Sequence, residues 1–277
     1  MARQNLHANR IKPQTSELLT LHVLRREQIS PHFSRVTLGR GDVERFVPMG
    51  FDQWFRLFIP VSDGSLARAP QKLNTIAFLR FLAVSKSERP VLRNYTVRDY
   101  REDGPDGPEL DVDFVLHGSA SDETAGPAAT WASTCTEGDP VAIFDEGVGF
   151  NPPDGLNRVR LVADESGLPA VAGILRSLPA DATGEAIVEV PSAEDQQPLT
   201  GPTGVEVTWV VRPDPHGVPG QAALAAASAL PATTEPFYGW VVGEQSLPTE
   251  LRRHWVGQGV PKNHIMFCGY WRVGRSQ

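Results

Sequence analysis

The chain has 277 residues, 40% of them hydrophobic, which is enough for two domains that each bury a core without disulfides or a structural metal. The formal net charge of −7 excludes a general binder of nucleic acid or of anionic membranes, because both need a positive field, so any basic site must be local. The two cysteines are too few for an iron–sulfur cluster, and the haem-attachment motif C-x-x-C-H is absent.

The first half of the chain predicts β-structure. Apolar and polar residues alternate in most of six stretches that end at Gly, Pro or Asp, which is typical of short antiparallel strands. One short helix is expected at 125–134, and residues 61–90 are expected to form a loop or lid with a helical part near 73–82. The pattern favours a closed or nearly closed antiparallel barrel. The expected strands are 18–27, 33–39, 53–60, 92–100, 110–118 and 139–146.

Residues 149–158 contain two adjacent prolines and two glycines and mark the expected domain boundary, with domains at 1–152 and 153–277. Strands then alternate with helices, which predicts an α/β domain with a parallel sheet and helical crossovers. Its expected strands are 158–163, 185–190, 205–211, 237–242 and 263–271, and its expected helices are 168–178, 220–230 and 248–259.

The compartment is predicted from apolar segments and cysteines. The amino-terminal residues contain no continuous apolar core of the signal-peptide type, and the most apolar stretch, 222–230, is too short to span a bilayer. Cys135 and Cys268 fit reduced thiols better than a disulfide framework. We therefore expect a cytoplasmic protein without membrane insertion, and a monomer, because no heptads or long apolar stripes demand a partner.

The hexapeptide RNYTVR, residues 93–98, concentrates cations and an aromatic ring on one expected strand. A side-chain period of two places Arg93, Tyr95 and Val97 on one face and Arg98 on the other. A cofactor with both a ring and a phosphate would find a π-surface and a guanidinium there, about 7 Å apart along the strand. The same residues could equally form a half-solvated face of the barrel.

The segment after the next expected strand combines a histidine with a glycine–proline helix start. His117 ends the strand, and Gly126, Pro127 and Ala128 open the helix. Proline in the first turn leaves backbone N–H groups near the surface, which suits a diphosphate. A strand-end histidine and simple turn punctuation would give the same letters.

The second domain begins with an apolar strand that runs into an acidic turn. Asp164 and Glu165 precede a glycine and a helix, at the sheet edge where α/β proteins bind ligands. The turn is not a G-x-G-x-x-G fingerprint, and two carboxylates would repel a pyrophosphate, so a dinucleotide must be held differently. The acidic pair could also simply cap the helix. A similar turn follows at Gly243 and Glu244, and no metal site is predicted, because the histidines lack ligand spacing.

In this order, the stretches RNYTVR, DVDFVLHG with GPAATWA, VADESGLPAVAGILRSLP, WVVGEQ and GYWRVG resemble the siderophore-interacting protein family of the ferredoxin-reductase-like superfamily. The resemblance spans roughly residues 19–274. It implies an N-terminal antiparallel Greek-key FAD-binding barrel and a C-terminal parallel-sheet, nicotinamide-binding-like domain. It also implies reduction of ferric siderophores to release Fe(II), with electrons from NADH, NADPH or a reduced ferredoxin.

The resemblance also assigns roles to residues. Arg93 would contact the FAD phosphates, Tyr95 would pack against the flavin and ribityl region, and Thr96 would lie near the flavin N5 edge. The turns at 164–166 and 243–244 would line the nicotinamide cleft, and residues 270–271 would approach the flavin from the second domain. The full cofactor-binding set is Arg93, Tyr95, Thr96, Val97, His117, Gly126, Pro127, Ala128, Asp164, Glu165, Ser166, Gly243, Glu244, Tyr270 and Trp271.

The implied reaction needs no protein catalytic group beyond the flavin. Siderophore oxygens hold Fe(III) better than Fe(II), so reduction releases the metal, and flavin can divide the two electrons of a nicotinamide into single ones. Arg98 and Arg272 adjoin matched motifs and are the best candidates to steer an anionic chelate. Two alternatives stay open: a generic flavin reductase with another acceptor, and a non-enzymatic siderophore-binding module.

Three features depart from the family pattern. The acidic turn carries Ser166 where relatives often have threonine, which keeps the hydroxyl. Thr130 stands where an arginine often precedes the helix tryptophan. Relatives often continue into a further helix, whereas this sequence ends at Gln277.

Overall fold

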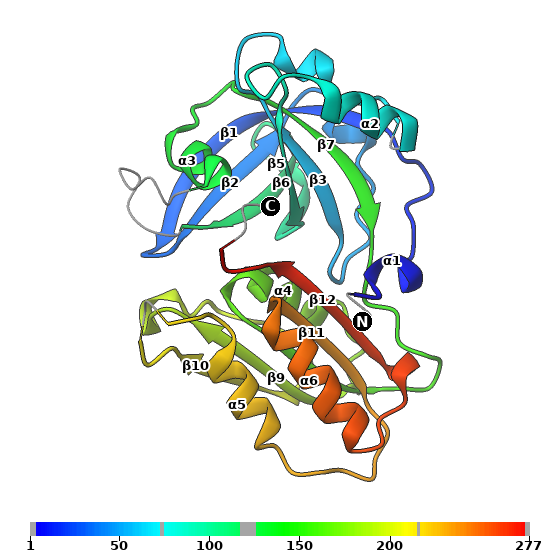
Figure 1. The fold of residues 1–277 in the computed structure, drawn as a ribbon. Coiled ribbons are helices and arrows are strands. Elements are labelled where there is room, and N and C mark those ends of the chain that lie inside the picture. The colour runs from blue at the N-terminus through cyan, green and yellow to red at the C-terminus, as the bar shows by residue number, and fades with distance from the viewer. Residues whose placement is uncertain (1–3, 73–74, 117–125, 215–216, 275–277) are drawn as a thin grey trace. The chain divides into compact units, whose positions relative to one another are not determined.

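The computed structural model describes residues 4–72, 75–116, 126–214 and 217–274. Its chain divides into two compact units, drawn in Figure 1. We call Lys12–Met49 with Gln53–Gly147 the barrel unit, and Met1–Ile11 with Gly50–Asp52 and Val148–Gln277 the α/β unit. The expected division into residues 1–152 and 153–277 treats each domain as one continuous segment, and it stays a prediction.

The barrel unit is a single antiparallel sheet of seven strands in the order β4-β3-β7-β1-β2-β6-β5. The predicted antiparallel barrel is confirmed, although the edge strands β4 and β5 are not hydrogen-bonded to each other, so the barrel is not closed. The strands are β1 Leu18–Ser30, β2 Phe33–Gly39, β3 Trp54–Ile59, β4 Val91–Thr96, β5 Asp99–Gly104, β6 Gly107–Val115 and β7 Pro140–Gly147.

The single strand expected at 92–100 is wrong, because β4 and β5 are separate strands at opposite edges of the sheet. The backbone changes partners between them: Val97 N donates to Gln53 O at 2.8 Å, and Arg98 N donates to Asp111 O at 2.9 Å. The chain therefore leaves β3 and joins β6 within two residues, which brings the two sheet edges near each other.

Alternation along the strands separates a core face from a polar face. On β6, Leu110, Val112 and Phe114 are buried in the main apolar core, while the intervening acidic residues point to the other side. The helix α3 Pro127–Thr134 packs against β2, β4 and β6. The loop expected at residues 61–90 contains the 3-10 helix η2 Ser65–Arg68 and the helix α2 Thr75–Ala83, and η1 Val43–Arg45 follows β2.

The α/β unit is a parallel sheet of five strands in the order β10-β9-β8-β11-β12, as predicted. Strand order reverses between β8 and β11, and ligands of α/β proteins bind at the carboxyl ends of strands at such a point. The strands are β8 Arg158–Ala163, β9 Thr183–Val190, β10 Gly204–Val211, β11 Tyr238–Glu244 and β12 Ile265–Trp271.

Helices cover this sheet. The helices α5 Gln221–Ser228 and α6 Ser246–Gly257 lie side by side on one face, where their apolar residues pack on β8, β11 and β12 (Figure 1). The other helical segments are α1 Leu6–Asn9, α4 Leu168–Ser177, η3 Glu165–Gly167, η4 Ala193–Asp195 and η5 Lys262–His264. In the described part of the chain, no helix combines the length and the apolar character needed to cross a membrane.

Segments distant in sequence complete the α/β unit. The Asn5 side chain donates to Ile265 O at 2.7 Å and accepts from Phe267 N at 3.0 Å. The buried carboxylate of Asp52 accepts hydrogen bonds from the backbone N–H groups at 149 and 150 and from Trp240 Nε1. Each polar group in this buried contact has a partner, as burial requires.

Candidate functional site

The strand β4 carries the first group of predicted site residues. Arg93 lies opposite Leu57 of β3 and is half-buried, and its Nη1 donates to Leu92 O at 2.7 Å. The remaining guanidinium N–H groups have no acceptor among the residues that the structure describes. Arg93 therefore keeps donors for a ligand.

Tyr95 is held by aromatic neighbours. Its ring centroid lies 4.3 Å from that of Phe114, and Phe114 lies 5.6 Å from Trp131 of α3. Burial raises the pKa of the Tyr95 phenol above its usual value, so the hydroxyl stays neutral at physiological pH. This row of three rings connects β4 to α3, and it places two stretches that the sequence analysis selected separately in one region of the barrel unit.

The helix α3 begins as expected for a binding turn. Gly126 is its N-cap, with extended backbone, and a Cβ there would meet no atom of the described residues within 4 Å; Pro127 occupies the first turn. Ala128 is buried in the core, and the first backbone N–H groups of a helix have no acceptor within it. His117, the remaining predicted member of this group, lies outside the described residues.

The residues present on the barrel unit fit FAD. A guanidinium and the amino end of an eight-residue helix are donors suited to a diphosphate, and a neutral phenol ring offers an aromatic surface. Thr96 and Val97 are buried beside them, so they shape the region more than they expose groups to it. The individual contacts to the cofactor stay predictions.

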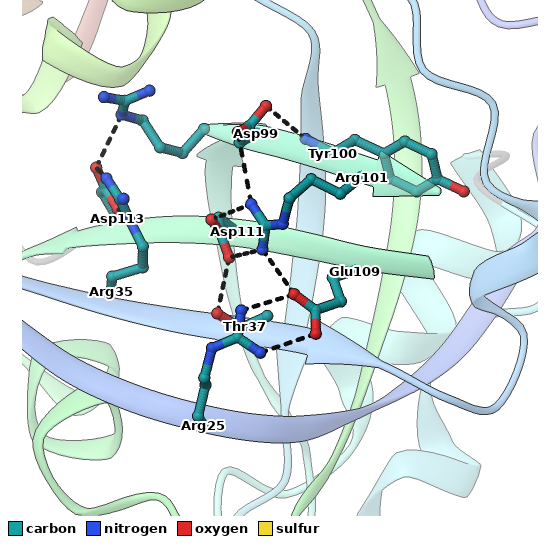
Figure 2. A network of polar contacts seen from close by, with 10 residues as sticks. Arg25, Arg35, Thr37, Asp99, Tyr100, Arg101, Glu109, Asp111 and Asp113 are labelled. Atoms are coloured by element: carbon teal, nitrogen blue, oxygen red, sulfur yellow. Dashed lines mark hydrogen bonds and ion pairs between the residues drawn. The ribbon is translucent and has the colours of Figure 1, made fainter. Parts of the chain in front are cut away.

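Arg98 belongs to a different environment. Its Nε lies 3.2 Å from Asp113 Oδ2. Asp113 belongs to the polar network of Figure 2, on the side of β6 opposite the apolar core. There the acidic side chains of β6 meet arginines from neighbouring strands: Arg35 binds Asp113 through two bonds, and Arg101 binds Asp111. A cavity of about 220 Å³ lies here, lined by Arg25, Glu27, Arg35, Thr37, Arg101 and Asp111. The steering role expected for Arg98 stays a prediction.

Asp164 is the centre of the second group, at the carboxyl ends of β8, β11 and β12. Its fully buried carboxylate caps η3 by accepting from Ser166 N at 2.9 Å, and it also accepts from the Ser166 hydroxyl. Glu244 N donates to it at 2.6 Å and Trp271 Nε1 at 3.2 Å. Burial first, and then the charge of Glu165, raise the pKa of Asp164 to about 7. The structure thus brings four of the predicted residues together around one carboxylate.

Glu165 is paired with an arginine that the sequence analysis missed. Arg212, directly after β10, binds Glu165 through Nη2 and Glu189 of β9 through Nε at 2.7 Å. The other Glu189 oxygen accepts from Ala223 N of α5 at 2.9 Å. Burial raises the pKa of Glu165, and Arg212 opposes that effect. A lone arginine at a strand end gives no sequence signal of which acids it will meet.

Gly243 and Glu244 complete the edge. Gly243 has a φ of 135°, and a Cβ there would lie 2.6 Å from Asp164 Oδ2, so the close approach of β11 to Asp164 requires glycine. The Glu244 carboxylate accepts from Ser246 N at 2.7 Å and from the Ser246 hydroxyl. Tyr270 is half-buried and Arg272 is exposed. Their approach to a flavin bound on the barrel unit stays a prediction.

Chemically, the two groups differ in sign. The group on the barrel unit offers N–H donors and a cation. The edge of the α/β unit instead holds buried carboxylates, and the one cation identified beside them among the described residues, Arg212, already forms ion pairs with two of these acids. Among the residues that the structure describes, no three His, Cys, Asp or Glu side chains form a metal-binding group.

Comparison with protein families assigns both halves of the chain. Residues 22–149 match the siderophore-interacting FAD-binding domain, and residues 156–274 match the siderophore-interacting protein model. The chain belongs to the siderophore-interacting protein family. The resemblance identified from the sequence is therefore confirmed, and the fit of the barrel group to FAD agrees with the domain match.

Relatives in this family cover nearly the whole chain. A protein of Mycobacterium tuberculosis is 32% identical over 94% of this chain and 92% of its own length. The ferric vibriobactin reductase ViuB of Vibrio cholerae is 25% identical, over 93% of this chain and 90% of that protein. The NADPH-dependent ferric-chelate reductase of Escherichia coli K12 is also 25% identical, over 91% and 92%.

Solved structures share the fold of this family member. A siderophore utilization protein from T. fusca has a TM-score of 0.74 and 28% identity, over 96% of this chain and 97% of that one. The siderophore-interacting protein SipS from Aeromonas hydrophila has a TM-score of 0.71 and 28% identity, over 94% of both chains. The ferredoxin reductase of carbazole 1,9a-dioxygenase, with a TM-score of 0.62 and 16% identity over 94% of this chain and 71% of that one, shares the ferredoxin-reductase-like fold.

Proposed function

We propose that this protein is an FAD-dependent reductase that reduces iron held by a siderophore and so releases Fe(II) in the cytoplasm. The observation that carries the proposal is the arrangement on the barrel unit: Arg93 with unused donors, Tyr95 in a row of rings, and the α3 amino end, within a siderophore-interacting FAD-binding domain. The names of two relatives, a ferric vibriobactin reductase and a ferric-chelate reductase, support the same reaction.

In this proposal the cofactor and the side chains of the protein have different roles. Bound FAD provides the electron chemistry, because a flavin accepts two electrons and can pass them on singly. Arg93 and the N–H groups of α3 hold the diphosphate, and Tyr95 fixes the position of the ring system by packing. The ferric chelate is the substrate. The siderophore binds Fe(II) less tightly than Fe(III), so reduction leads to release of the metal.

We further propose that electrons come from NADH, NADPH or a reduced ferredoxin. A dinucleotide at the edge formed by Asp164 and Gly243 would present its nicotinamide to carboxylates, so its phosphates must lie elsewhere. The domain match and the fold support a nicotinamide donor, and the name of the Escherichia coli relative favours NADPH. A monomer is sufficient for this reaction.

The test is an anaerobic titration of the purified, FAD-loaded protein. Bleaching of the flavin absorption by NADH, by NADPH or only by reduced ferredoxin identifies the donor, and recovery of the absorption on adding a ferric siderophore, with Fe(II) trapped by a chromogenic chelator, supports the reductase. A protein that stays colourless after incubation with FAD contradicts the proposal and leaves a siderophore-binding module.

A generic flavin reductase is the second candidate. It is favoured by one observation: Arg98, one of two cations expected to steer an anionic chelate, is engaged with the buried Asp113. In that case the reduced protein is reoxidised by quinones or dyes at least as fast as by ferric siderophores, and the ratio of the two turnover rates separates the candidates.

A further inference from the structure

The helix α2 exposes an apolar face that no described part of the chain covers. Ile76, Leu79 and Leu82 are 64%, 60% and 46% exposed, and they lie on one side of this nine-residue helix. Large apolar side chains scattered singly over a surface need no explanation, but three on so short a helix form a patch. We call these three residues the α2 outer face.

The opposite side of α2 is firmly anchored, so the exposure does not come from a loosely placed helix. Phe81 is 3% exposed, and its ring packs edge-on against Phe58 of β3 at 5.6 Å. The guanidinium of Arg89 lies 5.6 Å over the Phe81 ring and donates to Leu82 O at 2.8 Å, which caps the carboxyl end of the helix. On the barrel unit, α2 (Figure 1) thus forms a fixed ridge that is buried on its Phe81 side and exposed at the α2 outer face.

The charge around this ridge is opposite to that of the whole protein. Residues 61–90 contain five Lys or Arg and two Asp or Glu, a net charge of +3, whereas the chain carries −7. Arg68, Lys72, Arg80 and Lys86 are exposed, and no described carboxylate forms an ion pair with any of them. An acidic protein can bind an anionic surface through a local basic patch of this kind. The acidic residues that lie more than a Debye length from the surface are screened from it by salt and oppose the binding little.

We propose that α2 docks this protein on the surface of an anionic lipid bilayer, with the α2 outer face inserted between headgroups and the flanking cations bound to lipid phosphates. Exposed apolar residues bordered by Lys and Arg are the features of helices that lie in a membrane interface. A projecting ridge enters a bilayer without a matching groove, whereas a protein partner would have to supply one. The protein then works next to the membrane without spanning it.

The test is flotation of the full-length protein with lipid vesicles. The wild type is expected to float with vesicles of phosphatidylglycerol and phosphatidylethanolamine, and far less with phosphatidylcholine alone. Its binding to the anionic vesicles should fall when NaCl is raised from about 0.05 M to about 0.5 M.

Two variants address the two parts of the patch. Ile76→Ser/Leu79→Ser/Leu82→Ser should lower the partition coefficient at least about tenfold by removing apolar insertion. Arg80→Glu/Lys86→Glu should lower the partition coefficient about 25-fold or more, about fivefold for each of the two cations lost. Val211→Ser/Val218→Ser and Arg253→Glu, which alter exposed residues of the α/β unit, are the matched controls and should bind as the wild type does.

The outcomes are decisive in both directions. A wild type that stays at the bottom of the gradient with anionic vesicles overturns the proposal and leaves the α2 outer face as a surface for a protein partner. Equal binding by the wild type and either patch variant overturns it as well. Because all substituted side chains are exposed, circular dichroism and thermal unfolding should show intact folds, and the charge variant tests the patch even if the triple variant unfolds.

Discussion

Trp271 donates a hydrogen bond from its indole Nε1 to Asp164 Oδ2 at 3.2 Å, across 107 positions of sequence. The bond joins the last strand of the parallel sheet to the turn after its first strand. The same carboxylate also accepts a hydrogen bond from Glu244 N, so one buried acid connects the ends of three strands. Its protonation and its neighbours should therefore control the stability of this edge.

The free energy of unfolding should depend on pH through Asp164. Its pKa is raised from 3.8 to about 7 in the folded protein, so the folded state binds this proton more tightly than the unfolded state does. The stabilisation is complete below about pH 4 and is lost as the pH rises through about 7. Asp164→Asn should remove this part of the pH dependence, by at least about 1 kcal/mol between pH 5 and pH 8.

Urea unfolding of the wild type and Asp164→Asn at several pH values checks this expectation. The exposed carboxylate of Asp154 is the control, and Asp154→Asn should leave the wild-type pH profile unchanged. Parallel profiles for Asp164→Asn and the wild type would show that Asp164 is ionised throughout and that its four hydrogen bonds outweigh its burial.

Replacing Gly243 should disturb the same edge by geometry alone. A Cβ at this position would lie 2.6 Å from Asp164 Oδ2, on a backbone with a φ of 135°. Gly243→Ala should cost about 2 kcal/mol or more in the free energy of unfolding, because both the strain and the clash must be relieved. Gly257→Ala is the matched control: a Cβ there would meet no atom within 4 Å in the part of the chain that the structure describes, so thermal unfolding should shift little or slightly upward.

The sequence predicted the regular parts of the fold better than it predicted which segments pair with each other. The strands Phe33–Gly39 and Arg158–Ala163 have the expected bounds, because alternation and buried runs are local properties. The break between β4 and β5 was missed, because Val97 and Arg98 continue the alternation while their hydrogen-bond partners change from β3 to β6. Likewise the acidic turn at Asp164 was identified, but the ion pair of Glu165 with Arg212 depends on tertiary contact and has no local signal.

The network in Figure 2 should contribute to stability through Arg101. Its guanidinium binds Asp111 at 2.7 and 3.0 Å and Glu109 at 2.8 Å, and both acids are buried. In Arg101→Leu, the Thr37 hydroxyl at 2.7 Å is the only partner left to Asp111 among the contacts drawn in the figure. The substitution should therefore lower the free energy of unfolding by about 2–3 kcal/mol at pH 7. Urea unfolding measures this loss.

The same substitution should change the response to acid. Hydrogen bonds from Arg25 and then Arg101 lower the pKa of Glu109 from 4.5 to about 2, so its contribution is present above about pH 4.5 and is lost as the pH falls through 2. Arg101→Leu should therefore lose less stability than the wild type on acidification.

Arg40→Leu, which removes an exposed ion pair with Glu137, should change the free energy of unfolding by less than about 1 kcal/mol. Equal losses in the two variants would contradict a special role for the network.

The most direct prediction for the candidate site concerns Arg93. Its one bond within the described structure goes to Leu92 O, so Arg93→Ala should leave thermal unfolding of the FAD-free protein nearly unchanged. If the guanidinium holds the diphosphate, the Kd for FAD should rise about 10- to 100-fold, because a charge-assisted hydrogen bond to phosphate contributes about 1.5–3 kcal/mol. Fluorescence titration of the FAD-free protein measures the Kd. The exposed neighbour Asn94 gives the control, since Asn94→Ala removes a side chain from the same strand without removing a cation. An unchanged Kd in Arg93→Ala would show that Arg93 does not hold the diphosphate. Because no other described group on β4 can supply the same donors, the diphosphate would then lie elsewhere on the barrel unit.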